Sequence, residues 1–259
     1  MTIFFTISLL GVGTLYFFTD GIPAISDFIV NQLPKDIDRE LGKAVKVEVL
    51  NKYRLDDEKT EIANEFFSEL NIDNKTKVYV IKASEFNAFA TPGNYIFLFD
   101  KVFENIKSYP ELSALLAHEY AHIQNRHGIR RLAHELSRDL LTAFIWDDDK
   151  GVGKLVKNAN LILTLGNSRE FETQADIQAF QLLRDKKIDS KGLVDLFKLM
   201  EKIERKNSNK TPSYLSTHPD AEERLDLIQD SIKESPYDHD HFEKLEEIFQ
   251  RLNYKVDFK

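Results

Sequence analysis

His118 and His122 stand four residues apart, and Glu119 directly follows the first of them. Residues four apart lie on one face of a helix, so both imidazoles can reach a single metal ion. Glu119 can then reach a water molecule on that ion without ligating the metal itself. The chain contains no cysteine, so any zinc ion must be held by histidine or carboxylate side chains. This spacing predicts a metal centre that activates water.

A zinc hydrolase needs a third protein ligand and an open position for water. Glu172 and Asp176 lie four residues apart and would share a helix face. Glu172 can ligate the metal, while Asp176 can accept a hydrogen bond from the other ring nitrogen of a zinc-bound histidine. On its own this segment reads as an ordinary charged helix start. Its place after His122, at the beginning of a new helix, supplies the ligand that the first motif lacks.

Both motifs lie in segments with a helical pattern. From Pro110 to about Leu141 the pattern is strongly helical, since Pro110 suits a first turn and Glu111 complements the helix dipole. The second motif opens another helix, Glu170 to Arg184. Further helical patterns cover residues 56–70, 155–165, 190–205, 220–233 and 242–252.

Three short segments favour β-strands. Residues 44–50 place valine at every second position, which predicts a strand. Lys77 to Lys82 and Tyr95 to Phe99 are rich in β-forming residues, and Pro92-Gly93 lies between them, which indicates a hairpin-like pair. We therefore predict an α+β fold that is mainly helical, with a small β-sheet.

The N-terminus differs from the rest of the chain. Met1 to Thr19 carries no charged side chain, and as a helix it would span about 28 Å, close to the hydrocarbon core of a bilayer. We expect one N-terminal transmembrane helix, the alternatives being a cleaved signal peptide or a buried core helix. Asp20 and Asp27 follow the span and favour an extracytoplasmic, periplasmic-side location for the bulk of a single-pass membrane protein.

This pattern divides the chain into four parts. Residues 1–20 form the transmembrane anchor, which contacts membrane lipid, and residues 21–43 a membrane-proximal segment with a short amphipathic helix. Residues 44–235 form the domain that carries the predicted metal centre, and residues 236–259 carry a C-terminal amphipathic helix. The net charge of −8 and the lack of a basic stripe argue against nucleic acid as a partner.

The two motifs together resemble a known family. His118-Glu119-x-x-His122 and Ser168-Arg169-x-x-Glu172-x-x-Ala175-Asp176 look like the HtpX, BepA and CAAX-prenyl-protease group of gluzincin peptidases. The resemblance extends to the segment from Asn87 to Gly93, to Thr217-His218-Pro219 and to Glu223-Arg224. It covers roughly residues 78–228 and implies a zincin-like metallopeptidase domain.

The resemblance implies a role for each matching residue. His118, His122 and Glu172 match the ligands of one zinc ion per chain, Glu119 the general base, and Asp176 the acid that supports a ligand. His218 matches a histidine that can approach the metal and close its open position. Its alternative is a capping role, because Thr217 and Asp220 fit a capping box. Arg224 is expected to hold that segment by a salt bridge.

The expected substrate is a polypeptide that binds as an added strand along the Tyr95 to Phe99 edge. Asn87, Tyr95 and Phe97 are the expected substrate-binding residues. The other aromatic and histidine side chains receive structural interpretations. His127 would lie about 140° from His122 on a continuous helix, so we expect it and His134 to be surface or packing residues. The remaining expectations are solvated side chains for His239 and His241, and core packing for Tyr120 and Trp146.

These observations predict a zinc-dependent endopeptidase that acts in the quality control of membrane or envelope proteins. Three alternatives remain open. The protein could bind zinc but act as a proteolytically silent chaperone or assembly factor. It could be a latent protease that His218 inhibits, or a helical structural protein without a metal. The natural substrate and the oligomeric state stay undetermined.

Overall fold

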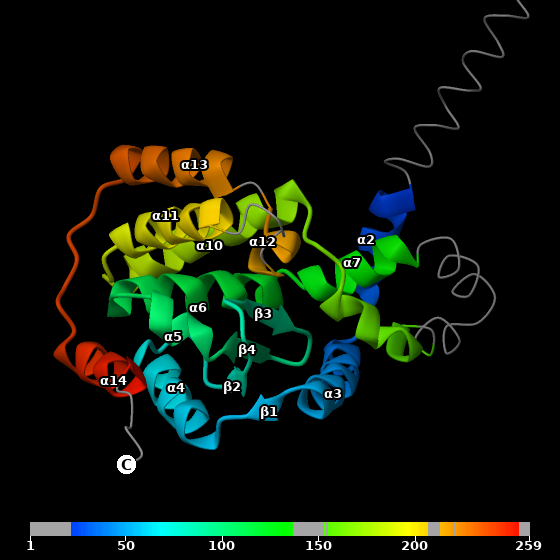
Figure 1. The fold of residues 1–259 in the computed structure, drawn as a ribbon. Helices are drawn as coiled ribbons and strands as arrows, with labels where there is room; N and C mark the ends of the chain where they lie inside the picture. The colour runs from blue at the N-terminus through cyan, green and yellow to red at the C-terminus, as the bar shows by residue number, and fades with distance from the viewer. Residues whose placement is uncertain (1–21, 137–152, 154, 207–212, 220, 254–259) are drawn as a thin grey trace, which may run out of the picture.

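The computed structural model describes residues 22–136, 153, 155–206, 213–219 and 221–253. The expected transmembrane helix, Trp146 and Asp220 lie outside these residues. Within them, no helix combines the length and the apolar character needed to cross a bilayer. The predicted α+β class is confirmed, because helices surround one small mixed sheet (Figure 1).

The sheet has four strands in the order β1-β2-β4-β3. Their bounds are Arg54–Leu55 for β1, Lys77–Lys82 for β2, Ala88–Thr91 for β3 and Tyr95–Phe99 for β4. The predicted hairpin between β2 and β4 is wrong, because the two strands are neighbours but run parallel. The hairpin is instead β3–β4, which is antiparallel. Its turn contains Gly93 and Asn94 at φ of 78° and 65°, a conformation that these two residue types adopt readily.

The strand predicted for residues 44–50 is also wrong, because these residues belong to helix α3, Lys35–Lys52. Ile37, Leu41, Val45 and Val49 recur every four residues and are all buried, whereas Val47 is 60% exposed. Alternate valines contain an i, i+4 pair, so a short run fits both periods, and the upstream residues decide for the helix. Helix α3 thus runs across residues 43 and 44, where the sequence suggests a boundary.

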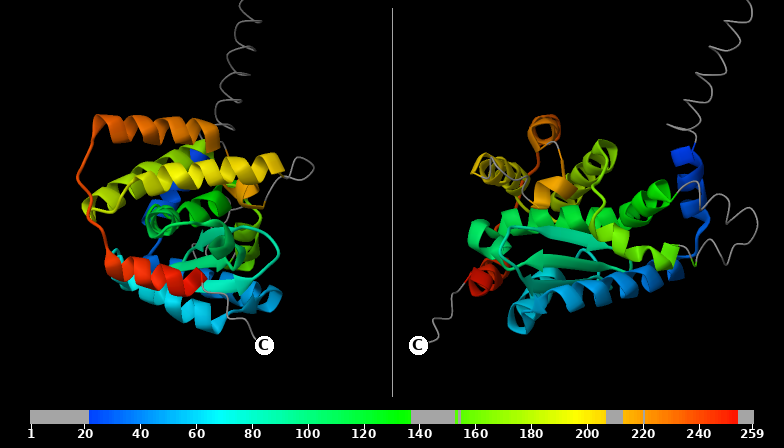
Figure 2. Two further views of the ribbon diagram at one scale, coloured as in Figure 1. Left: turned by 60° about the vertical axis from the view of Figure 1, so that its left-hand side comes forward. Right: turned by 45° about the vertical axis from the view of Figure 1, so that its right-hand side comes forward.

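The helices cover both faces of the sheet. Helix α6, Tyr109–Gln124, packs on one face of the sheet together with the apolar side of α4, Asp57–Glu69, while α3 packs on the other face (Figures 1 and 2). Three helices pack beyond α6, namely α10 (Arg169–Asp185), α11 (Lys191–Lys206) and α13 (Ala221–Glu234). The predicted C-terminal amphipathic helix is confirmed as α14, Glu243–Asn253, which packs against α4.

The helix predicted from Pro110 to Leu141 is interrupted. Helix α6 ends at Gln124, and α7, His127–Glu135, begins after Arg126, whose φ of 56° is left-handed. The Arg126 guanidinium forms an ion pair with Asp38 at 2.7 Å and donates to the Val30 carbonyl at 2.6 Å. These bonds tie the break to the N-terminal helices. The change of direction gives His127 an orientation that a continuous helix would not have.

Four short helices complete the described chain. Helix α2, Ile22–Gln32, packs beside α7 and confirms the predicted membrane-proximal helix as a helix. The segment predicted as a helix over residues 155–165 contains a 3₁₀ helix, η2, Ala159–Leu163. The other two are α5, Lys101–Asn105, and α12, Ser213–Thr217.

Candidate metal centre

Two imidazoles on α6 face the same point. His118 and His122 are 1% and 5% exposed, and their Nε2 atoms lie 3.0 Å apart. Two ring nitrogens this close would repel each other through their lone pairs unless a proton or a cation lay between them. The first turn of α6 is fixed by Ser108, whose hydroxyl accepts from the Glu111 backbone N–H at 3.4 Å. The helix thus presents both rings on one buried face.

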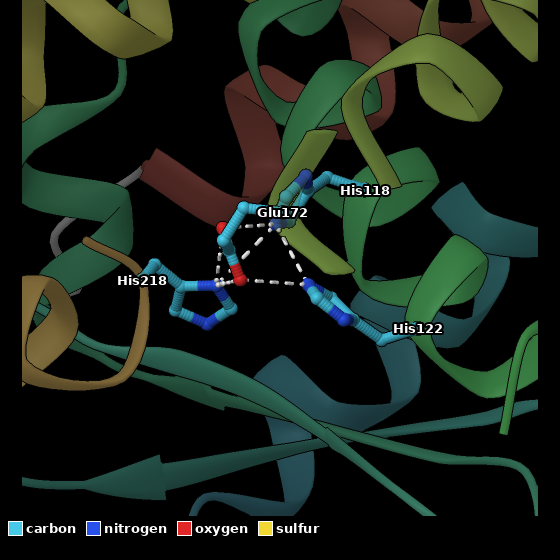
Figure 3. Close-up of side chains that lie close together, drawn as sticks. All are labelled: His118, His122, Glu172 and His218. Carbon is cyan, nitrogen blue, oxygen red and sulfur yellow. Dashed lines mark hydrogen bonds and ion pairs between the residues drawn. The ribbon is translucent and has the colours of Figure 1, made fainter. Parts of the chain in front are cut away.

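Glu172 reaches this point from the first turn of α10. Ser168 caps that helix by accepting a hydrogen bond from the Phe171 backbone N–H at 3.2 Å. Glu172 is 0% exposed, with Oε2 3.5 Å from His118 Nε2 and Oε1 3.4 Å from His122 Nε2. Figure 3 shows its carboxylate facing both imidazoles from one side. The structure therefore brings together the three ligands expected from sequence.

His218 joins these three side chains from the residue after α12. Its Nδ1 atom lies 3.0 Å from Glu172 Oε1 and 3.4 Å from His118 Nε2. Its ring stacks on Tyr214 at a centroid distance of 4.3 Å, and it is 2% exposed. Thr217 donates to the Tyr214 carbonyl at 2.9 Å, while the proposed capping partner Asp220 lies outside the described residues.

The four donors lie close enough together to share one zinc ion. One ligand atom from each of His118, His122, Glu172 and His218 lies within 4.8 Å of the other three. The nearest contacts between donors run from 3.0 to 3.5 Å. Ligands about 2.0–2.1 Å from a tetrahedral ion are about 3.3 Å from each other. Imidazole nitrogens with one carboxylate oxygen are ligands that suit zinc better than calcium or magnesium.

Asp176 and Arg224 support the His118 side of the site. Asp176 Oδ1 lies 2.8 Å from His118 Nδ1, which leaves Nε2 of that ring facing the other donors. Arg224 grips the Asp176 carboxylate with two nitrogens, at 2.7 and 2.8 Å, and lies 2.6 Å from Glu172 Oε2. Burial alone would raise the pKa of Asp176, but the Arg224 guanidinium holds it below its ordinary value. The salt bridge expected of Arg224 is therefore made with the site itself.

His127 supports the His122 side, a contact that the sequence did not reveal. Its Nδ1 atom lies 2.8 Å from His122 Nδ1, and its Nε2 atom lies 3.2 Å from Gln174 Oε1. The ring is fully buried and stacks on Phe171 at 4.3 Å with an interplanar angle of 6°. Burial lowers its pKa to about 4, so the ring is neutral at pH 7. The surface alternative for His127 is wrong, because the break at Arg126 turns it toward His122.

The tautomers on this side follow from the hydrogen-bond order. If His122 Nε2 faces a cation, its proton lies on Nδ1 and is donated to His127 Nδ1. His127 must then carry its own proton on Nε2, where Gln174 Oε1 accepts it. The chain from His122 through His127 to Gln174 thus has a donor and an acceptor at each step.

Glu119 lies in the same cleft but belongs to no ion pair closer than the 3.6 Å between its Oε1 and His218 Nε2. It is 0% exposed, and neither carboxylate oxygen accepts a hydrogen bond from the residues that the structure describes. Burying such a group without partners is costly. The carboxylate is therefore placed to receive a proton donor that enters the cleft, such as water.

The cleft has a volume of about 350 Å³ and lies between β3 and the α6–α7 junction. Phe89, Ala90 and Thr91 line it on the strand side, together with Asn87. The expectation that substrate adds along Tyr95 to Phe99 is wrong, because β4 is paired on both sides, with β2 and with β3. Neither Tyr95 nor Phe97 lines the cleft. Among the described strands, the edge that faces it is β3.

The other histidines and Tyr120 lie away from the donors. His134 contacts Asp27 at 3.0 Å on the α2 side, and His239 lies near Asp189 at 3.7 Å with half of its side chain exposed. His241 is exposed and faces the ring of Tyr109. Tyr120 is buried beside Phe67, as expected for a packing residue.

Asn167, just before the α10 cap, is a site residue that the sequence did not suggest. Its amide nitrogen donates to Glu172 Oε1 and lies 3.4 Å from His218 Nδ1. Asparagine before a serine cap is common in any loop, so the residue type alone gives no signal.

Comparison with known proteins agrees with this geometry. The model of peptidase family M48 matches residues 54–232. The mitochondrial metalloendopeptidase OMA1 of Schizosaccharomyces pombe is 29% identical over 166 residues, which cover 63% of this chain and 48% of that protein. A putative beta-barrel assembly-enhancing protease of Vibrio cholerae is 26% identical over 172 residues, covering 61% of this chain and 35% of that protein.

A third relative is the metalloprotease YcaL of Escherichia coli, which is 25% identical over 166 residues. The match covers 60% of this chain and 61% of YcaL. In each of these three comparisons the chain spans less than two thirds of its relative.

Proposed function

The chain belongs to peptidase family M48, and from this premise we propose that it is a zinc-dependent endopeptidase. The observation that carries the proposal is the convergence of His118, His122 and Glu172, with donor atoms 3.0 to 3.5 Å apart. The Glu119 carboxylate, which accepts no hydrogen bond from the described residues, lies in the same cleft. The metal would be one zinc ion per chain.

Each residue has one task in the proposed reaction. When bound, zinc would polarise the scissile carbonyl and lower the pKa of water. Glu119 takes the proton of the attacking water and returns it to the leaving amine. Asp176 keeps the proton of His118 on Nδ1, and His127 does the same for His122. Both ligand rings then offer Nε2 to the metal without rotating.

The proposed substrate is a polypeptide that adds a strand to β3. Main-chain hydrogen bonds along that edge would give affinity with little demand on sequence. Asn87 and Phe89 line the cleft beside it and are the proposed contacts. N-methylation of alternate peptide amides in a substrate should then reduce cleavage strongly, while methylation of the intervening amides should not. Equal effects at both sets of positions would contradict strand addition.

We also propose that the protein is membrane-anchored, with its catalytic domain on the extracytoplasmic side, and acts on misfolded or mis-assembled membrane or envelope proteins. The uncharged run Met1 to Thr19 supports the anchor. Fractionation of the full chain, with protease accessibility of a C-terminal tag, tests both parts. Recovery in the soluble fraction would contradict the anchor, and protection of the tag in intact cells with a permeabilised outer membrane would contradict the orientation.

A second candidate is a latent protease, favoured by the position of His218. Its Nδ1 atom completes the set of four donors and so takes the position that a water molecule would need. In a latent enzyme, replacement of His218 by alanine raises proteolysis. In a freely active enzyme the same replacement leaves proteolysis unchanged or lowers it.

Zinc content and casein hydrolysis, measured for the wild type, Glu119→Gln and His218→Ala, test the proposal. We expect about one zinc per chain in all three, and a loss of about 10²-fold or more in activity for Glu119→Gln. Activity that appears only in His218→Ala indicates the latent form. Zinc without activity in any form indicates the silent chaperone, and absence of zinc contradicts a metal enzyme altogether.

A further inference from the structure

Arg131 is a cation in the cleft that has no carboxylate partner among the described residues. It lies on α7, one turn after His127, and lines the same cleft as Glu119 and His122. Its Nη1 atom donates to the Leu165 carbonyl, and its Nε atom is buried without an acceptor. The neighbouring arginine, Arg130, faces the other way and forms an ion pair with Asp27 at 2.9 Å.

A guanidinium that no carboxylate contacts calls for a physical reason. Burial lowers the pKa of Arg131 to about 10, although the charges of Glu172 and Glu119 act in the opposite direction, and the group stays charged at pH 7. The Leu165 carbonyl oxygen accepts a hydrogen bond from one of the five N–H groups of Arg131. A neutral side chain could donate the same bond, so this contact does not explain why the position carries a charge. A buried charge normally has a partner of opposite sign. The remaining donors of Arg131 are therefore available to an anion that enters the cleft.

The charge balance around the site favours such an anion once the metal is bound. With the histidines neutral, as metal ligands must be, the buried carboxylates of Glu119, Glu172 and Asp176 outnumber the guanidinium groups of Arg131 and Arg224 by one. A divalent cation on the donor set would turn this excess of one negative charge into one positive charge. The loaded cleft would then attract a negative group and disfavour a positive one.

Helix α7 comes close to the β3–β4 turn at Gly128, three residues before Arg131, where an added Cβ atom would sit 3.2 Å from Pro92 Cδ. Gly128 and Arg131 line the cleft opposite the β3 residues Phe89 and Ala90. A peptide on the β3 edge would therefore lie between the strand and α7. Confinement of this kind favours a forked hydrogen bond from guanidinium to carboxylate over contact with bulk water.

We propose that Arg131 determines specificity by binding a carboxylate of the peptide substrate. This inference rests on the proposed peptidase function. The carboxylate can be an aspartate or glutamate side chain, or the C-terminus of the peptide. Arg131 has no part in the proton transfers assigned to Glu119 and acts by selecting the substrate.

The test uses zinc-loaded full-length protein and four matched fluorogenic peptides. One pair carries glutamate or glutamine near the scissile bond and has an amidated C-terminus. The other pair has no acidic side chain and ends in a free carboxylate or an amide. The ratio of kcat/KM within each pair is measured for the wild type, Arg131→Met, Arg131→Lys and Arg130→Met. The ratio removes differences in the amount of folded, zinc-loaded enzyme.

We expect the wild type to prefer the carboxylate member of at least one pair by about tenfold to a hundredfold, the range for hydrogen bonds to charged groups. Arg131→Met should bring that ratio to about one. Arg131→Lys should keep part of the preference, because it keeps the charge without the fork. Arg130→Met, which removes the same charge outside the cleft, should keep it in full. An unchanged ratio in Arg131→Met, or an equal loss in Arg130→Met, would overturn the proposal.

A binding measurement separates this proposal from the proposed function. Fluorescence anisotropy of the same peptides with zinc-loaded Glu119→Gln does not require turnover. Tighter binding of the carboxylate peptides, lost in Glu119→Gln/Arg131→Met, supports the subsite even if no peptide is cleaved. Equal binding of both members of each pair overturns the subsite, even if the protein proves to be an active peptidase.

Discussion

The two histidines of α6 have the same role in the proposed metal centre but opposite surroundings. His118 is held by a carboxylate, Asp176, which Arg224 grips in turn. His122 is held by a neutral imidazole, His127, which in turn donates a hydrogen bond from Nε2 to Gln174 Oε1. Both contacts fix which ring nitrogen faces the metal. The two contacts therefore share a correctly placed hydrogen-bond acceptor, not a charge.

The difference shows how the site divides its charges. A second carboxylate beside His122 would add to the buried negative charge of Glu172 and of Glu119, whose oxygens accept no hydrogen bond from the described residues. A neutral acceptor avoids this repulsion at the same hydrogen-bond length, 2.8 Å on each side. Loss of the charged contact should therefore lower both the stability of the protein and its affinity for the metal. Loss of the neutral contact should lower mainly the affinity for the metal.

The largest expected effect follows from Asp176→Asn. Asparagine can still accept from His118 Nδ1, but Arg224 loses its bidentate partner and is left as a buried charge paired with Glu172 alone. We expect zinc affinity to fall about 10–100-fold and the free energy of unfolding to fall by about 3–5 kcal/mol. Competition with a zinc chelator and urea unfolding measure the two effects. Asp185→Asn, an exposed position on the same helix, is the control and should change neither.

The neutral side should respond differently to His127→Leu. This variant removes the acceptor of His122 Nδ1, so zinc affinity should fall about tenfold. His127→Asn supplies an amide oxygen near the same place and should restore part of the affinity. His134→Leu, on the same helix and away from the donors, should leave affinity unchanged. If His127→Leu bound zinc as tightly as the wild type, the proposed support of His122 would be wrong.

The two sides should also differ in the pH dependence of stability that they give the metal-free protein. Burial lowers the pKa of His118, but the hydrogen bonds and charges of Asp176 and Glu172 together outweigh burial and raise the pKa to about 9. This contribution to stability is present below the unfolded value of about 6.5 and is lost as pH rises through 9. The pKa of His127 is lowered to about 4, because the folded protein favours its neutral form. The folded protein therefore loses stability as pH falls from about 6.5 towards 4.

The two sides can therefore be separated by urea unfolding with a chelator at pH values from 5 to 9. We expect Asp176→Asn to flatten the fall in stability on the alkaline side, and His127→Asn to flatten it on the acid side. Each contribution amounts to at most about 1.4 kcal/mol per pH unit. If each variant changed both sides equally, the assignment of one charged and one neutral side would fail.

Local patterns in the sequence are sufficient to predict much of the candidate metal centre. The spacing of His118 and His122, and the helix start at Ser168, depend on residues within one or two turns and could be read directly. The parallel pairing of β2 with β4 is non-local, since β3 lies between them in sequence and at the edge in space. The residue pattern within a single strand does not indicate which strands are neighbours in the sheet. The sequence therefore predicts β4 as the substrate-binding edge, whereas the edge strand beside the cleft is β3.

The contacts of His127 and Arg131 could not be predicted from the sequence because of the backbone conformation of one residue, Arg126. A left-handed backbone at Arg126 breaks the helix, although arginine is a good helix former and seldom takes that conformation. Its guanidinium is held by Asp38 and by carbonyls of Val30 and Leu33, which lie about ninety residues earlier in the chain. Only tertiary bonds of this kind could show that the residues after Arg126 turn toward the cleft.

The most direct test of the metal centre is an anomalous difference map at the zinc edge from crystals of the full-length Glu119→Gln protein. The proposed centre predicts one peak, about 2.0–2.2 Å from His118 Nε2, His122 Nε2 and a Glu172 oxygen. A peak that excludes Glu172, or no peak at this point in protein shown to contain zinc, would contradict it.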